Sequence, residues 1–445
     1  MEVQSSDIEI KLGGAMTAIT DSSPIDIKIG GTPTPNNKKP KIESLWCNLP
    51  GNVLIFIIER LCYVDQIYFR AVCKDWRSKI YRSVRRSDNF PWILVASTGD
   101  TLSRNIISIS NQCYLFDPIH KQKYTIQNQI LDGAQIHASK FGWLLLSRNT
   151  KSKYFFSFYS PFTNKIIELP ELHMELSAGK IFRDAMATFS TAPTSSDCVI
   201  CVVSTEPTKK DPSGSKHLFI EEFCVSTCSP GGGRGKTWNN VLLGMNCYKY
   251  DTVVSRIAHV DGVFYFIFEG VDDLMGAFKP GLQEWKAYPY PRLSFLQCID
   301  CLIDSEDNEN LLMSYYHGRH KTWHVWQFNK AEKNWCELEK LGSRMLFVSA
   351  TSTSLQLAAS AKDEEEEEED GEGMGSFANT IHVAYGIYPH LECSSQFYKK
   401  VDNHPSCSQI YGWIDKEGLS SQISDWLDME VLLRLIWIEP PNMYF

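Results

Sequence analysis

The segment FFSFYSPFTNKIIELP, residues 155–170, shows the pattern that decides the fold: an aromatic-rich strand, a turn at Pro161 and a second short strand. Four other segments repeat this pattern: CYLFDPIHKQKYTI, CVSTCSPGGGRGKTW, LMGAFKPGLQEWKAYP and WHVWQFNKAEKNWCEL. Their turns are marked by Pro118, Pro230, Pro280 and Asn329, so that successive markers, Pro161 included, lie 43, 69, 50 and 49 residues apart. A unit of several strands that recurs about every 40 to 50 residues is typical of the blades of a β-propeller.

Short β-like runs continue between and beyond these segments, so we expect an all-β body over residues 92–440. The body has room for six or seven degenerate blades, because the 69-residue interval can hide insertions or a further unit around CVICVVS, residues 198–204. A two-sheet sandwich is the alternative. The predicted fold class is therefore multi-domain, with a short α-helical segment ahead of a β-propeller-like body.

One acidic run accounts for the formal net charge of -9, because nine of the ten residues from Asp363 to Glu372 are acidic. A run this charged cannot pack, so we expect residues 361–376 to form a disordered loop inside the β body, with a partner-binding segment as the alternative. The rest of the chain is neutral, with only a modest Lys/Arg excess between Arg70 and Arg86. That balance argues against a nucleic-acid partner.

The N-terminus lacks the charged start and apolar core of a signal peptide, and no later stretch reaches the ~18 apolar residues of a membrane span. Residues 1–40 are poor in apolar periodicity, so we expect a disordered tail, and the KKPK at its end is too short to identify a nuclear import signal.

The 14 cysteines are scattered through apolar runs. We therefore expect buried thiols without disulfides, no membrane, and a location in the nucleus, the cytoplasm or both.

The sequence pattern changes from Ser44 onward, in the segment LWCNLPGNVLIFIIERLCYVDQIYFRAVCKDWRSKIYRSV, residues 45–84. Apolar residues with helical spacing predict a first helix from Pro50 to about Cys62, and Asp65 is placed to cap a second helix. Residues 53–58, VLIFII, are apolar all round the first helix, which a unit this small cannot bury on every side. Another surface must therefore cover these residues. It is the surface of a partner protein or, if the helices simply pack on the β body, the surface of that body.

Residues 44–82 closely resemble an F-box, which has a Leu-Pro pair, a Leu/Ile-rich helix, an Asp and a Val-Cys-x-x-Trp-Arg segment in these positions. The resemblance implies binding to the Skp adaptor of a cullin-RING ubiquitin ligase. The residues that it assigns to adaptor binding are Leu49, Pro50, Leu54, Ile57, Ile58, Leu61, Val72, Cys73, Trp76 and Arg77.

The body resembles the kelch-like β-propeller of plant-type F-box proteins of the KIB class, over roughly residues 136–440. The similar pieces are FGWLLLS with SPFTNKIIELPEL, HVDGVFYFIFEGVDDLMGAF, ELEKLGSRMLFVSATS and a closing WIEPP. The chain departs from the family at the acidic insertion and around IHVAYGIYPHLEC, which leaves the blade count near the C-terminus open. This resemblance implies a substrate receptor, whose propeller holds a protein target for ubiquitination.

Two patterns could suggest zinc, and neither is convincing. Cys198-x-x-Cys201 and Cys298-x-x-Cys301 lie in strand-like runs, where residues three apart point to opposite faces of the sheet. The histidines His317, His320 and His324 lack the Glu of a helical zinc motif. We expect no metal and no other cofactor.

The sequence GGGRGKT, residues 231–237, falls short of a phosphate-binding loop, because Pro230 occupies the place of its first glycine and no helical pattern follows. No nucleophile or acid–base signature appears elsewhere. We therefore expect a non-catalytic subunit of a ubiquitin ligase. The alternatives are a scaffold outside the ligase and an enzyme with a pocket at the mouth of the propeller.

Overall fold

The computed structural model describes two separate units of the chain, a helical unit within Gly13–Ser87 and a β unit within Asp88–Asn442. The described residues are 49–58, 60–61, 65–66, 69, 72–79, 90–98, 109–117, 122–150, 153–173, 175–176, 180–181, 183–205, 219–230, 237–247, 253–269, 274–290, 298–304, 310–317, 322–342, 344–349, 353–357, 380–384, 398–399 and 433–440. The predicted tail, residues 1–40, and the acidic loop, residues 361–376, lie outside them. In the described part of the chain, no helix is both long and apolar enough to cross a membrane.

The first helix of the helical unit, α1 (Gly51–Ile58), starts directly after Pro50 and ends sooner than predicted. The carbonyl of Pro50 accepts the N–H groups of Val53 and Leu54 at 3.1 and 3.2 Å, which begins the helix. After Ile58 the chain tightens into a turn, in which Leu61 N–H donates to the Ile58 carbonyl at 3.2 Å. Bonds of this tighter type commonly end a helix.

The second predicted helix is interrupted, and Cys73 rather than Asp65 begins its last part, α3 (Lys74–Lys79). Asp65, Gln66 and Phe69 are helical, whereas Val72 and Cys73 are not. The Sγ atom of Cys73 accepts the N–H of Trp76 at 3.4 Å, and the Cys73 carbonyl accepts the N–H of Arg77 at 3.2 Å. These are the bonds of an N-cap, with sulfur in place of the usual oxygen, so the prediction of one continuous helix is wrong.

The β unit consists of six sheets of four or five strands and a short two-stranded sheet, among the described residues. From the inner strand outward they are sheet 1, with β27 (Leu433–Ile438), β1 (Trp92–Thr98), β2 (Ile109–Asp117) and β3 (Gln122–Gln127); sheet 2, with β4 (Gln135–Lys140), β5 (Trp143–Asn149), β6 (Lys153–Ser160) and β7 (Lys165–Glu168), and with β8 (Leu172–His173) also beside β6; sheet 3, with β11 (Arg183–Phe189), β12 (Ile200–Thr205), β13 (Phe219–Cys228) and β14 (Asn239–Cys247); sheet 4, with β15 (Val253–Val260), β16 (Val263–Glu269), β17 (Leu274–Lys279) and β18 (Glu284–Pro289); sheet 5, with β19 (Cys298–Asp304), β20 (Leu311–His317), β21 (Thr322–Asn329) and β22 (Asn334–Glu337); and sheet 6, with β24 (Thr353–Leu357), β23 (Arg344–Ser349), β25 (Thr380–Ala384) and β26 (Tyr398–Lys399). The short sheet pairs β9 (Glu175–Leu176) with β10 (Lys180–Ile181).

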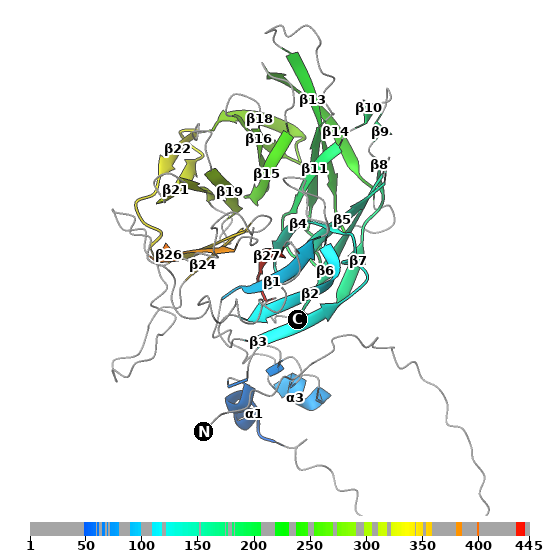
Figure 1. Ribbon diagram of the computed structural model, residues 1–445, viewed down its shortest axis with the longest axis vertical. Coiled ribbons are helices and arrows are strands. Elements are labelled where there is room, and N and C mark those ends of the chain that lie inside the picture. Colours follow the sequence, from blue (N-terminus) through cyan, green and yellow to red (C-terminus); the bar gives the residue numbers. More distant parts are fainter. Residues whose placement is uncertain are drawn as a thin grey trace, which may run out of the picture. The chain divides into compact units, whose positions relative to one another are not determined.

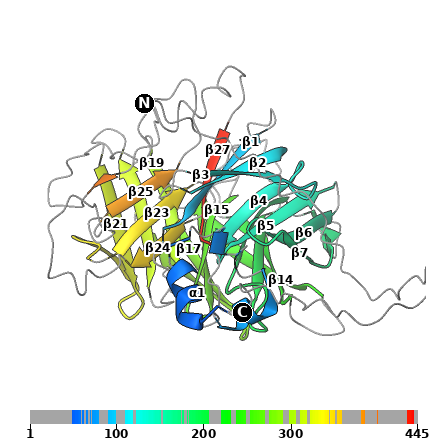
Figure 2. The ribbon, with the colours of Figure 1, turned by 90° about the horizontal axis from the view of Figure 1, so that it is seen from below.

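The six sheets form a closed ring, because each inner strand lies beside that of the next sheet (Figures 1 and 2). The order is β27, β4, β11, β15, β19 and β24, and β23 and β25 of sheet 6 return to β27. The strand that completes sheet 1 comes from far along the chain: β27 pairs antiparallel with β1, with Trp92 opposite Ile438. The first and the last described strands of the β unit therefore share one sheet, and a propeller rather than a two-sheet sandwich results.

Sheets 1 to 5 are regular antiparallel blades, and the Pro or Asn markers predict where their last turns occur. Each marker lies at the connection between the third and the outer strand of one blade. These connections join β2 to β3, β6 to β7, β13 to β14, β17 to β18 and β21 to β22. Pro118 itself lies outside the described residues.

Sheet 6 departs from this plan, so the described residues show five regular blades and do not support the prediction of six or seven. Strand β23 pairs with β24 on one side and, in parallel, with β25 on the other. The connection from β24 to β25 contains the acidic run. A connection of that length does not force the antiparallel hairpin that a tight turn imposes.

Aromatic and aliphatic side chains fill the spaces between neighbouring blades. Phe158 of sheet 2 meets Phe189 of sheet 3 edge to face, with ring centroids 4.9 Å apart. Phe223 of sheet 3 meets Phe266 of sheet 4 in the same way at 5.8 Å. Burial of such rings is the main favourable term in assembling the ring of sheets.

Of the β-unit cysteines whose side chains the structure describes, most are buried, as predicted, and none of these forms a disulfide. Burial raises the pKa of Cys113 to about 12, so this thiol stays protonated at neutral pH. The buried cysteines Cys198, Cys201, Cys224 and Cys228 belong to sheet 3 or lie next to it. They act as small core residues.

Candidate functional site

Three of the residues assigned to adaptor binding form the core of the helical unit. Leu54 and Ile58 of α1 and Trp76 of α3 are 0%, 1% and 8% exposed. Leu49, Phe69 and Cys73 pack around them, and the rings of Phe69 and Trp76 lie 4.4 Å apart. These residues hold α1 against α3. They position the predicted adaptor-binding surface from the interior of the unit rather than forming that surface.

The remaining predicted residues lie nearer the surface. Pro50, Val72 and Arg77 are exposed, and Val72 is 62% exposed although it is apolar. The half-buried residues are Leu49, Ile57, Leu61 and Cys73. The predicted set therefore combines surface and interior positions of one small unit.

Two exposed apolar residues of α1, Val53 and Phe56, were missed by the sequence reasoning. They are 38% and 56% exposed. With 3.6 residues per turn, Pro50, Val53 and Ile57 fall on one side of the helix and Phe56 lies next to them, away from Leu54 and Ile58. We call these four residues, Pro50, Val53, Phe56 and Ile57, the outer face of α1. The run VLIFII contains the signal for these two residues, because the apolar residues of a helix that do not face the core of their unit must face outward.

The outer face carries a positive charge at one end. The guanidinium carbon of Arg60 lies 3.4 Å from the ring centroid of Phe56, and Nη1 of Arg60 donates to the Phe56 carbonyl at 2.9 Å. A cation over an aromatic ring is attracted by the electrons of the ring face. The stack fixes the Phe56 ring on the surface of the unit.

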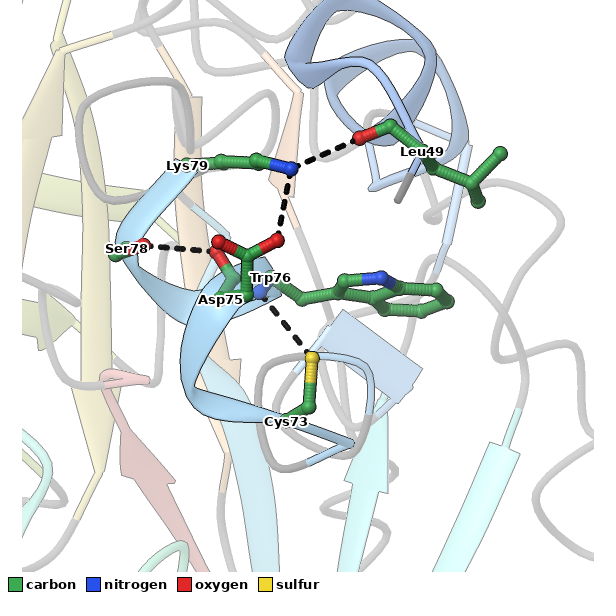
Figure 3. Close-up of polar contacts among 6 residues, drawn as sticks. All are labelled: Leu49, Cys73, Asp75, Trp76, Ser78 and Lys79. Carbon is green, nitrogen blue, oxygen red and sulfur yellow. Dashed lines mark hydrogen bonds and ion pairs between the residues drawn. The ribbon is translucent and has the colours of Figure 1, made fainter. Parts of the chain in front are cut away.

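Polar contacts from α3 hold the start of α1 in place (Figure 3). The Nζ atom of Lys79 donates to the Leu49 carbonyl at 3.2 Å and pairs with the Asp75 carboxylate at 2.7 Å. The Oγ atom of Ser78 donates to the Asp75 carbonyl at 2.8 Å. Since Lys79 and Asp75 are partly solvated, their ion pair adds little stability, and its effect is to orient Lys79 toward the Leu49-Pro50 pair.

Within the described residues, no group of three or more His, Cys, Asp or Glu could hold a metal ion. The side chains of Cys298, Cys301 and His317 lie outside what the structure describes. His324 pairs instead with Glu337, with Nδ1 and Oε1 2.6 Å apart on the surface of sheet 5. His320 and most of GGGRGKT lie outside the described residues. The outer face of α1, with its exposed apolar residues beside the Arg60 guanidinium, is the candidate binding surface.

Comparison with known proteins gives a family for each unit. A family model described as an F-box domain matches residues 46–87, and one described as the KIB1-4 beta-propeller matches residues 106–365. An F-box/kelch-repeat protein of Arabidopsis thaliana is 28% identical over 70% of this chain and 78% of its own length. An F-box protein of the same plant is 25% identical over 68% of this chain and 72% of its own length.

Proposed function

This chain belongs to the KIB1-4 beta-propeller family and carries an F-box domain, and from these two memberships we propose that it is the substrate-recognition subunit of an SCF-type cullin-RING ubiquitin ligase. The F-box binds the Skp-type adaptor, and through it a cullin. The propeller binds a protein target, which is then ubiquitinated. The chain itself makes or breaks no covalent bond.

The observation that carries the proposal is the outer face of α1. Exposed apolar side chains on a helix of a small unit cost free energy unless a partner covers them. Val53, Phe56 and Ile57 recur at the spacing by which a helix docks into an apolar groove. The adaptor is the partner that an F-box implies.

Two binding surfaces in one chain are sufficient for such a function. This chain links a target on the propeller to an enzyme on the cullin that carries activated ubiquitin. The encounter between the target and that enzyme therefore becomes intramolecular. The gain is one of effective concentration and orientation. A catalytic residue in this chain is therefore not required.

The test is the affinity of the full chain for a purified Skp-type adaptor, measured by titration calorimetry with Val53→Ala and Phe56→Ala combined. Interface anchors are typically worth about 2 kcal/mol each, so the double variant is expected to bind over a hundredfold more weakly if the losses add. Both side chains are exposed and alanine favours helix, so the fold should persist. Leu49→Ala would be less informative, because Leu49 also packs on the core.

The matched control is Phe155→Ala in β6, where a phenylalanine 40% exposed lies in the β unit. It should leave adaptor affinity unchanged. Equal binding by the double variant and the wild type would contradict the proposal. To test the second surface, the chain without residues 1–88 should still capture targets but no longer support their ubiquitination in a reconstituted ligase.

A further inference from the structure

The outer strand of sheet 3, β14, presents an open edge of nine residues. It pairs with β13 along its whole length, from Phe219 opposite Cys247 to Thr227 opposite Asn239. No other described strand pairs with it. The unpaired N–H and C=O groups of such an edge are a template for another strand.

This edge lacks the protection that the other outer strands have. A charged residue on an edge strand opposes pairing with another chain, because pairing would desolvate the charge. The outer strands with such residues are β3 with Lys123, β7 with Lys165 and Glu168, β18 with Glu284 and Lys286, β22 with Glu337, and β26 with Lys399. The sequence of β14, NNVLLGMNC, contains no charge.

The edge is also prominent. Strand β13 pairs with β12 only between Phe223 and Cys228, whereas its pairing with β14 continues to Phe219. The hairpin therefore extends beyond β12 as a two-stranded arm, seen at the top of the ring in Figure 1. An arm that projects from its sheet meets less steric hindrance from the neighbouring blades when another strand approaches.

An exposed leucine lies at the middle of this edge. Leu242 is 48% exposed, while its neighbours Val241 and Leu243 are half-buried against the core between sheets 3 and 4. An apolar side chain on an open, uncharged edge gains from being covered by a paired strand.

We propose that β14 pairs antiparallel with β14 of a second copy of this chain, so that two propellers join edge to edge about a two-fold axis. In a two-fold interface each strand meets its own sequence. An outer strand with charges of one sign, as in β3, β22 and β26, would therefore bring like charges close together, whereas β14 brings none. With the axis at Leu243, Leu242 lies opposite Gly244 of the second copy, which has no side chain to obstruct it.

The test is sedimentation equilibrium of the purified full chain from about 1 to about 100 μM, a range suited to an interface well below standard size. The wild type should pass from monomer to dimer mass. Leu242→Lys places two lysines diagonally across the axis, about 7–8 Å apart, and should raise the dimer dissociation constant at least about tenfold. Leu242→Glu should do the same.

An equimolar mixture of the lysine and glutamate variants should recover the dimer, since opposite charges then lie diagonally across the axis. Such recovery requires that the two strands lie side by side. The matched control is Ile166→Lys, which charges a residue 43% exposed in β7, an outer strand that is already charged. It should dimerise as the wild type does.

A monomeric wild type throughout the range would overturn the proposal and leave the edge to an extended segment of a different protein. Dimerisation that Leu242→Lys does not weaken would also overturn it, and would point to the outer face of α1. The measurement uses no adaptor and no target. Its failure is therefore distinct from a failure of the proposed ligase function.

Discussion

At the scale of the residue, the apolar side chains of α1 divide between two environments, and Leu54 and Phe56 show the difference. Leu54 is 0% exposed and Phe56 is 56% exposed, although they are two positions apart in a continuous apolar run. The run itself indicates that some surface must cover the helix. Which residues face inward depends on the rotation of the helix against Trp76 of α3, and a helix that is apolar on every side carries no signal for that rotation.

His137 of β4 makes a pH-dependent contribution to stability. It lies in the interior of sheet 2, with Nε2 2.7 Å from the Ser147 Oγ and its ring beside Phe156. Burial lowers its pKa from 6.5 to about 4. Between these values the unfolded chain binds a proton that the folded chain does not, so the free energy of unfolding should fall as pH decreases from about 6.5 to about 4.

The expected loss is about 3 kcal/mol over that range, and it is absent above pH 6.5. Urea unfolding at a series of pH values measures it. His137→Gln should lower stability at neutral pH but flatten this part of the profile, because glutamine does not titrate. A profile as steep as that of the wild type would show that other groups carry the acid sensitivity.

At the scale of the element, turns were better predicted than strand partners. The connections after Pro161, Pro280 and Asn329 share one backbone form. The fourth residue of each turn has a positive φ, namely Asn164 at 54°, Gln283 at 54° and Lys333 at 56°. Proline and asparagine favour such turns for local reasons, so their spacing can be read from the sequence. Glutamine and lysine at the left-handed position give no such signal.

Sheet 6 and the cap of α3 could not be predicted in this way. The parallel pair of β23 and β25 depends on a connection whose path is not encoded in any short pattern. The cap at Cys73 uses a residue type that is uncommon there, so the break in the helix between Phe69 and Lys74 has no familiar sequence signal.

The acidic connection between β24 and β25 should be dispensable for folding. Leu357 at the end of β24 pairs with Arg344, and Thr380 at the start of β25 pairs with Met345, so both strands meet the acidic segment at one end of β23. Two strand spacings, about 10 Å, separate them. After deletion of residues 362–374, the remaining residues 358–361 and 375–379 can span that gap.

Differential scanning fluorimetry should show a melting temperature within a few degrees of the wild type for this deletion. A matched deletion within the hairpin turn, removing residues 280–283 between β17 and β18, should destabilise sheet 4 instead, because that turn sets the strand register. A large drop for the acidic deletion would mean that the run pairs with a basic surface of the chain.

At the scale of the whole β unit, stability should depend on the pairing of β27 with β1. Ile436, Trp437 and Ile438 are at most 1% exposed, and the Glu439 carboxylate accepts the N–H of Phe141, in the turn between β4 and β5, at 3.2 Å. Truncation after Leu432 removes the inner strand of sheet 1. It should abolish cooperative thermal unfolding and yield aggregating protein, since β1 becomes an open apolar edge.

Truncation after Pro440 is the matched control, because it shortens the chain but keeps β27. Circular dichroism melts and light scattering should leave this variant close to the wild type. Cooperative unfolding of the chain truncated after Leu432 would instead show that the other sheets form a stable body without the closing strand.

The pairing of β1 with β27 also determines when the β unit can finish folding during synthesis of the chain. About 340 residues separate the two strands, and at about 5–20 residues per second the ribosome needs roughly 20–70 s to make them. For that period Trp92–Thr98 has been made but its partner has not. The β unit can therefore be completed only after Ile438 has been made, and a chain released early by a nonsense codon before Leu433 would present an open apolar edge to chaperones rather than a receptor to a target.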